Sequence, residues 1–240
     1  KRIPERSILV VTSKVVSIWQ GRCISQNEVT SKDAFIRREA DYYLPRDKKT
    51  PWVMLTKKHG FIIPTAGIDE SNGNGHFILL PSNPGNCAKR LHAWIRKMYG
   101  IKRVGVVITD SRSIPARRGV VGYALAYWGF APLNDYRGKK DLFNRKFYVT
   151  QTNVADSLAA AAVLVMGEGN ESTPLAVISE IPFVSFAEKS KKSSKKFSSF
   201  EVRPNKDLYA PLYKRIKWKK GGGGIKGLFL HRKAHSATDP

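Results

Sequence analysis

The chain has 240 residues, of which 42% are hydrophobic and 10% aromatic, so most of it is expected to fold around a buried core. Its two cysteines exclude a disulfide scaffold and a cysteine-based zinc site, and no apolar run reaches the roughly 18 residues of a membrane span, so we expect a cytoplasmic protein without a membrane segment. The 42 Lys and Arg residues against 19 Asp and Glu give a formal net charge of +23, which attracts polyanions such as nucleic acids and nucleotides without choosing among them.

The first half of the chain predicts short strands and one helix. Residues 7–17 form a β-branched apolar run that is typical of a strand. Thr30 and Asp33 have the spacing of a capping box, which predicts a helix start over 34–43. Short strands are expected over 52–55, 60–63 and 76–80, and the Gly- and Asn-rich residues 66–75 are expected to form a loop.

The second half alternates helices and strands. An amphipathic helix is expected over 86–99, followed by Gly100, and the clearest helix of the chain over 153–166, followed by Gly167. A buried strand over 104–109 runs directly into Asp110 and then into a basic turn. Further strand-like segments are 120–128, which could also be a tightly packed element, 147–150 and 174–178. This alternation predicts a mixed α/β or α+β fold.

The C-terminal region differs in composition. We expect a catalytic body over 1–186, a basic low-complexity loop over 187–204, an aromatic and basic segment over 205–220 that docks on the body, and a flexible tail over 221–240. Gly221–Gly224 is interpreted as a flexible linker. An alternative is that the basic tail, with Tyr209, Tyr213 and Trp218, binds single-stranded nucleic acid by charge and stacking.

Acidic residues are scarce in this chain, and three of them follow or interrupt predicted elements. Asp69 lies in the Gly- and Asn-rich loop, Asp110 at the end of the most apolar strand and Glu168 just after a helix. Their oxygens could converge on Mg²⁺ or Mn²⁺, or each could cap a turn by itself. Phosphate-binding loops of the GxxxxGK[ST] type, nucleophile elbows and HExxH zinc motifs are absent from the sequence.

Four segments in the same order resemble the coenzyme F420-0:γ-glutamyl ligase family and its bacterial relatives. They read ILVVTSKVVS at 8–17, AGIDESN at 66–72, VVITDS at 106–111 and DYRGKKDLFNRKFYVTQTNVADSLAAAAVLVMGEG at 135–169. The resemblance implies an α/β fold with two lobes, mixed sheets and packed helices. It also implies a GTP-dependent ligase with two Mg²⁺ or Mn²⁺ ions, and homodimers.

Matched position by position, the resemblance assigns metal-binding roles to Asp69, Asp110, Ser111 and Glu168. Asp69 and Asp110 are also the expected catalytic carboxylates, with Arg117 as a cationic helper. Nucleotide contacts are expected from Ser13, Lys14 and Asn72. The loop that follows the clearest helix is expected to complete the nucleotide site with Met166, Gly167, Gly169, Asn170, Glu171, Ser172 and Thr173.

The chain also departs from the family pattern. Ile18 and Gln20 replace a lysine and a glutamate, and Ser113 and Ile114 replace a Gly-Arg pair. The acceptor is therefore left open between an F420 precursor and a folate, with GTP, L-glutamate and this carboxylate-bearing compound as the expected partners. The expected reaction is amide formation through an acyl phosphate, and the alternative is a nucleic-acid-binding or non-catalytic relative.

Overall fold

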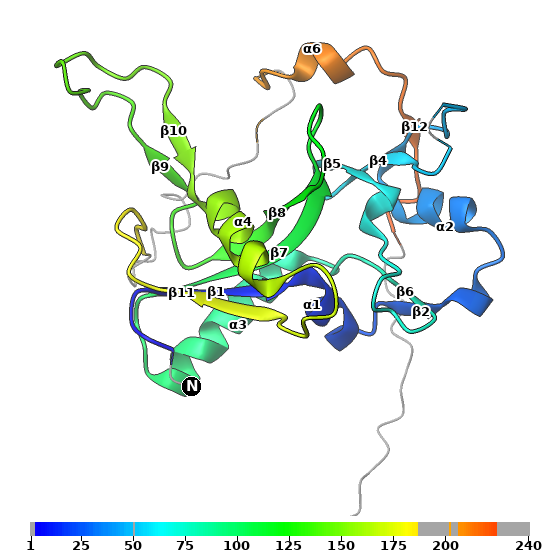
Figure 1. Ribbon diagram of the computed structural model, residues 1–240, viewed down its shortest axis with the longest axis horizontal. Coiled ribbons are helices and arrows are strands. Elements are labelled where there is room, and N and C mark those ends of the chain that lie inside the picture. The colour runs from blue at the N-terminus through cyan, green and yellow to red at the C-terminus, as the bar shows by residue number, and fades with distance from the viewer. Residues whose placement is uncertain (1–2, 50, 187–201, 203–205, 225–240) are drawn as a thin grey trace, which may run out of the picture. The chain divides into compact units, whose positions relative to one another are not determined.

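The computed structural model describes residues 3–49, 51–186, 202 and 206–224 (Figure 1). Contacts divide the chain into two units, the first comprising 1–29 and 67–216 and the second 30–66 and 217–240. The predicted mixed α and β composition is confirmed, since both units combine helices with strands. Residues 30–66, which we expected within the body 1–186, instead share the second unit with residues from the end of the chain.

A four-stranded mixed sheet forms the centre of the first unit. Its strands are β1 (Ser7–Thr12), β7 (Val104–Ser113), β8 (Val120–Trp128) and β11 (Leu175–Ile178), in the order β11-β1-β7-β8. β1 runs parallel to β7, and the two outer pairs are antiparallel. The paired stretch of these two parallel strands is buried from Ser7 to Val11 and from Val104 to Thr109, as expected for continuous β-branched runs.

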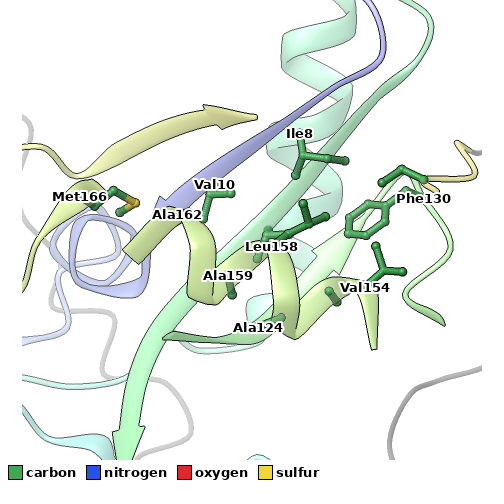
Figure 2. Packing of buried hydrophobic residues seen from close by; sticks show 12 residues of the cluster. Ile8, Val10, Ala124, Phe130, Val154, Leu158, Ala159, Ala162 and Met166 are labelled. Carbon is green, nitrogen blue, oxygen red and sulfur yellow. The ribbon is translucent and has the colours of Figure 1, made fainter. Parts of the chain in front are cut away.

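Helix α4 (Val154–Met166) covers one face of this sheet, and α3 (Pro84–Tyr99) packs on the opposite side (Figure 1). The side chains of Ile8, Val10 and Ala124 meet the alanine-rich face of α4 (Figure 2), and Val107 belongs to the same buried cluster. The expected caps of both helices are present: Gly100 has φ 66° after α3, and Gly167 has φ 79° after α4.

Smaller elements complete the first unit. Helix α1 (Ser13–Trp19) follows β1 directly, β2 (Cys23–Ser25) pairs with β6 (His76–Ile78), and β9 (Leu133–Asp135) pairs with β10 (Gln151–Asn153) at the base of an extended arm. Among the described residues, the other helices of this unit are the short η1 (Gln26–Glu28) and α6 (Ala210–Tyr213).

The second unit joins helix α2 (Lys32–Glu39) to an antiparallel sheet of order β12-β3-β4-β5. Its strands are β3 (Tyr42–Tyr43), β4 (Leu55–Lys58), β5 (Phe61–Pro64) and β12 (Lys219–Lys220), and the 3-10 helix η2 (Thr65–Gly67) follows β5. The cap of α2 differs from the prediction: Ser31, not Thr30, accepts the Ala34 N–H.

Gly221–Gly224 does not behave as the flexible linker that we expected. The four glycine N–H groups donate to the carbonyls of Asp41, Arg37, Ala40 and Arg38 in turn, at 2.9–3.0 Å. These carbonyls lie at the end of α2, where a helix leaves its last acceptors unsatisfied. A Cβ on Gly221 would lie 2.1 Å from the Ala40 carbonyl oxygen, so only glycine fits. Residues 225–240 lie outside the described residues.

Several predicted boundaries were wrong. Residues 13–17 form helix α1 rather than the end of a strand, because the chain turns at Thr12 and buries Ser13, Val16 and Ser17. The residues 52–55 and 147–150 were expected to be strands, whereas β4 and β10 begin at Leu55 and Gln151. β7 continues to Ser113, so Asp110 lies within a strand paired to β8 and not at its end.

The C-terminal aromatic residues have partners within the described chain. Lys57 lies 4.5 Å from the centre of the Trp218 ring, and the Tyr213 hydroxyl donates to Asp207. The segment 206–216 belongs to the first unit and 217–224 to the second. Of the basic loop 187–204, only Val202 lies within the described residues. No helix in the described part of the chain is both long enough and apolar enough to span a bilayer.

Candidate functional site

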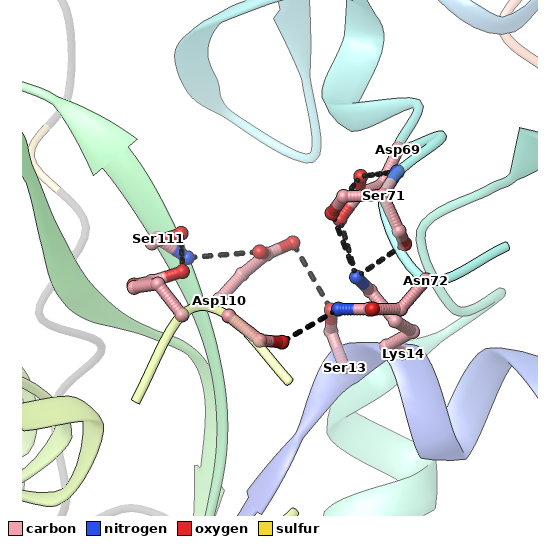
Figure 3. Close-up of polar contacts among 9 residues, drawn as sticks. Ser13, Lys14, Asp69, Ser71, Asn72, Asp110 and Ser111 are labelled. Atoms are coloured by element: carbon pink, nitrogen blue, oxygen red, sulfur yellow. Dashed lines mark hydrogen bonds and ion pairs between the residues drawn. The ribbon is translucent and has the colours of Figure 1, made fainter. Parts of the chain in front are cut away.

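The start of helix α1 brings a hydroxyl group to the Asp110 carboxylate. β1 and β7 are parallel neighbours with Thr12 opposite Thr109. Ser13, which follows Thr12, therefore lies beside Asp110, which follows Thr109. Ser13 Oγ donates to Asp110 Oδ2 at 3.0 Å, and the Ser111 N–H donates to Asp110 Oδ1 at 2.8 Å (Figure 3). Two predicted site segments that are 97 residues apart in sequence therefore meet at one carboxylate.

Asp69 is held by the next residue of the same helix. Lys14 Nζ lies 2.8 Å from Asp69 Oδ2 and also donates to the Ser71 carbonyl at 2.9 Å. The Ser71 N–H and hydroxyl each donate to Asp69 Oδ1 at 2.7 Å (Figure 3). Burial opposes ionisation of Asp69, but the Lys14 ammonium and the Ser71 donors outweigh it and lower the pKa of this carboxyl. Asp69 is thus anionic and engaged with a cation at neutral pH.

Glu168 reaches the site from the C-terminal end of α4. The Ser111 hydroxyl donates to Glu168 Oε2 at 3.1 Å. Gly167, with φ 79°, turns the chain out of the helix, and a Cβ at this position would lie 2.3 Å from Glu171 Cδ. The glycine thus permits the close turn after which Glu168 contacts Ser111 on β7.

The two Gly-containing loops of the site are joined by a side chain. Asn72 Nδ2 donates to the Gly169 carbonyl at 2.7 Å. The second loop is organised internally, because Glu171 Oε2 accepts the Gly169 N–H at 2.8 Å and Thr173 Oγ1 donates to the Met166 carbonyl at 2.5 Å. Asn72, Gly169 and Glu171, which were expected to contact nucleotide, therefore belong to one connected network, and Met166 and Thr173 form a second contact in the same loop.

The pKa of Asp110 responds to the negative charges of Asp69 and Glu168. Burial, with smaller contributions from the negative charges of Asp69 and Glu168, raises the pKa of Asp110 to about 6, despite the lowering effect of the Ser111 N–H and the Ser13 hydroxyl. Three carboxylates that are far apart in sequence are thus close enough to influence one another. An added cation would relieve this repulsion.

Comparison with known proteins identifies the family. A sequence model of the family described as F420-0:Gamma-glutamyl ligase matches residues 1–180. The chain belongs to this family. It is 34% identical over 196 residues to the coenzyme F420:L-glutamate ligase of Methanococcus maripaludis strain S2, covering 75% of this chain and 78% of that protein.

Two further F420-0:γ-glutamyl ligase relatives support the assignment. The coenzyme F420:L-glutamate ligase of Methanocaldococcus jannaschii is 34% identical over 200 residues, with 75% of this chain and 79% of that protein covered. The protein of the same name from Archaeoglobus fulgidus is 36% identical over 191 residues, with 74% and 76% covered. The resemblance expected from the sequence motifs is therefore confirmed, and these relatives are archaeal.

The donors at the site of this F420-0:γ-glutamyl ligase family member have the chemistry that Mg²⁺ and Mn²⁺ prefer. Asp69, Asp110, Ser111 and Glu168 offer carboxylate and hydroxyl oxygens, the Ser111 hydroxyl donates to Glu168, and Lys14 already provides a cation to Asp69. Among the described residues, no group of three or more His, Cys, Asp or Glu side chains is placed so that it could hold a metal ion. The oxygen donors are of the type that Mg²⁺ prefers, and an ion held by so few protein ligands would need to take its others from phosphate and water.

Arg117, the remaining predicted catalytic residue, forms a hydrogen bond within its own turn. It lies in the exposed turn between β7 and β8, where its N–H donates to the Ile114 carbonyl at 3.2 Å. Its catalytic role stays a prediction, as do all of the expected nucleotide contacts and metal-binding roles. Ser71 was missed, although an Asp two residues before a Ser is the usual signature of a side chain that closes a turn.

Proposed function

We propose that this protein is a GTP- and divalent-metal-dependent ligase that joins L-glutamate through an amide bond to a carboxylate acceptor, either F420-0-like or folate-like. The supporting observation is that Asp69, Asp110 and Glu168 approach one another beside two Gly-containing loops in a chain of this family. The names of the relatives support glutamate as one substrate and an F420 compound as the other.

The proposed chemistry activates the acceptor by phosphorylation. A carboxylate is a poor electrophile at neutral pH, so the γ-phosphoryl group of GTP is transferred to its oxygen, which forms an acyl phosphate and releases GDP. The glutamate amine then attacks the acyl carbon, phosphate leaves and the amine loses a proton. Phosphoryl transfer requires orientation and charge neutralisation more than covalent help from the protein.

The residues of the chain supply this orientation. Asp69, Asp110, Ser111 and Glu168 would hold Mg²⁺ or Mn²⁺, which supplies positive charge to the phosphate oxygens when bound. Ser13 orients the Asp110 carboxylate through its hydroxyl group. Lys14, which is within reach of Asp69, adds a further cation beside the phosphates. Asn72 keeps the two loops at a fixed separation, so that their backbone amides can face the nucleotide.

Asp110→Asn tests this proposal because it removes a charge and nearly preserves shape. We expect ligation to fall at least 100-fold and the Mn²⁺ dependence to shift to higher concentration. The assay incubates the protein with L-glutamate, GTP and Mn²⁺ together with a panel of F420 precursors and folates, and detects glutamylated products by mass spectrometry. Asp47→Asn, on an exposed loop, is the matched control. An unchanged rate and metal dependence in Asp110→Asn would reject the assignment.

We also propose that the protein forms homodimers. The arm between β9 and β10 extends from the first unit and exposes apolar side chains, with Leu142 96% and Phe143 78% exposed (Figure 1). Soluble monomers seldom expose such apolar patches without a partner. Phe143→Glu should therefore yield a monomer in light scattering coupled to size exclusion, whereas Trp52→Glu, an equally exposed aromatic of the second unit, should not.

A further inference from the structure

A β-bulge lies immediately before Asp110 in the β7–β8 pair. Ile108 is opposite Ala126, but the next residue, Thr109, is opposite Ala124, so Leu125 is an extra residue on β8. Such a bulge changes the direction of the strands and the side on which later residues point. The orientation of Asp110 and Ser111 relative to the sheet therefore depends on this irregularity.

Asp156, in the first turn of α4, bonds directly to the bulge. Its Oδ1 accepts the Ala124 N–H at 2.9 Å, and Ala124 is 0% exposed. Its Oδ2 accepts from Asn153 Nδ2 at 2.8 Å, while its own N–H donates to Asn153 Oδ1 at 3.1 Å. A side chain of the helix thus replaces a strand carbonyl as the acceptor for a buried backbone donor.

A basic side chain also links Asp156 to the same strands. Arg112, two residues after Asp110 on β7, has a guanidinium nitrogen 3.9 Å from Asp156 Oδ2 and lies 4.9 Å from the centre of the Tyr123 ring. Tyr123 pairs with Asp110 across the strands. The Asp156 carboxylate therefore contacts both strands of the hairpin that carries Asp110.

Helix α4 connects Asp156 at its start to Glu168, which follows its end. It spans about 15 Å from Asp156 to Met166, and Glu168 follows two residues later. The helix lies close to β8, because a Cβ on Gly122 would lie 2.7 Å from the Ala159 carbonyl oxygen. Asp156 fixes one end of α4 to the strand that pairs with Asp110, and the other end presents Glu168.

We propose that Asp156 is a positioning residue: by accepting the Ala124 N–H it fixes the bulge and, through α4, the separation of Glu168 from Asp110 and Ser111. This inference rests on the proposed function, since it assigns Asp156 to the support of the metal-binding carboxylates. Removing a residue that orients a metal ligand without touching the metal commonly weakens metal binding by 10- to 100-fold.

The experiment compares Asp156→Ala, Asp156→Asn and Ser157→Ala by titration with Mn²⁺ alone and by hydrogen exchange at the Ala124 amide. Asp156→Ala should weaken Mn²⁺ binding about tenfold and accelerate exchange at Ala124. Asp156→Asn keeps an oxygen acceptor and should recover most of the affinity and protection. Ser157→Ala loses a hydrogen bond to the Asn153 carbonyl in the same helical turn and should match the wild type in both.

Asp156→Glu provides a variant that retains the charge if Asp156→Ala does not fold. Its extra methylene displaces the acceptor from Ala124, so we expect weaker Mn²⁺ binding with unchanged circular dichroism. Wild-type Mn²⁺ affinity in both Asp156→Ala and Asp156→Glu, or in the latter alone when the former is unfolded, would overturn this inference only. Failure of the wild-type protein to bind Mn²⁺ would overturn both the proposed function and the inference.

Discussion

Ser13 Oγ lies 3.0 Å from Asp110 Oδ2 and donates a hydrogen bond to it, although the two residues are 97 positions apart. The contact exists because β1 and β7 are parallel neighbours and both segments leave the paired region at the same level of the sheet. It joins the beginning of α1 to the carboxylate whose pKa is raised by burial and by two other acidic residues. This contact is a direct target for mutation.

Ser13→Ala should weaken Mn²⁺ binding several-fold and lower the ligation rate, because Asp110 loses the donor that orients it. The expected loss of folding stability is about 1 kcal/mol, which is the usual size of one hydrogen bond. Ser17→Ala is the control, because the Ser17 hydroxyl is buried on the same helix but has no hydrogen-bond partner among the described residues. Equal effects of the two variants on Mn²⁺ binding would contradict this role of Ser13.

Asn72→Ala should raise the KM for GTP about tenfold, corresponding to about 1.4 kcal/mol, because the bond between the two Gly-containing loops is lost. Asn74→Ala is a close control, since Asn72 and Asn74 both have positive φ, at 53° and 43°, and alanine strains both backbones similarly. Steady-state kinetics with varied GTP measures the difference. A similar KM in the two variants would show that backbone strain, not the contact with Gly169, causes the effect.

Gly122→Ala should destabilise the first unit by about 1–3 kcal/mol, since the new methyl group would overlap the Ala159 carbonyl and the Val163 side chain. Thermal unfolding monitored by circular dichroism should give a Tm several degrees lower. Gly85→Ala, at the start of α3, has no atom within 4 Å of the added Cβ and should leave the Tm unchanged or raise it. A wild-type Tm in Gly122→Ala would indicate that α4 packs less closely on β8 than described.

His92 should make the protein less stable as the pH falls. Burial and the nearby Arg96 charge lower the pKa of His92 below its usual value of 6.5, against the favourable hydrogen bond with the Val104 backbone. The unfolded chain therefore binds the proton more readily, so this contribution is present above about pH 6.5 and is lost on acidification below it.

His92→Gln should reduce the difference in Tm between pH 7.5 and pH 5.5, whatever its effect on the Tm itself. His76→Gln serves as the control because His76 is exposed. The comparison uses the pH dependence rather than absolute stability, so a general packing defect would not imitate the expected result. A pH dependence as steep as in the wild type would exclude His92 as its source.

Local sequence patterns were sufficient for the long elements. The apolar periodicity before Gly100 and the alanine run before Gly167 predicted α3 and α4 to within a few residues, because helix periodicity and glycine caps are encoded within one segment. The motifs also indicated Asp69, Asp110 and Glu168 as candidate site residues and the family to which the chain belongs.

Only the tertiary structure decided how these residues meet. The β-branched residues after Thr12 have the local preference of a strand, yet burial of Ser13, Val16 and Ser17 makes them a helix. The extension of β7 past Asp110, the bulge at Leu125 and the acceptance of the Ala124 N–H by Asp156 all depend on partners far along the chain. Such contacts form because packing whole elements together lowers the free energy of the fold. The sequence of one local segment does not determine which distant residues it will pack against.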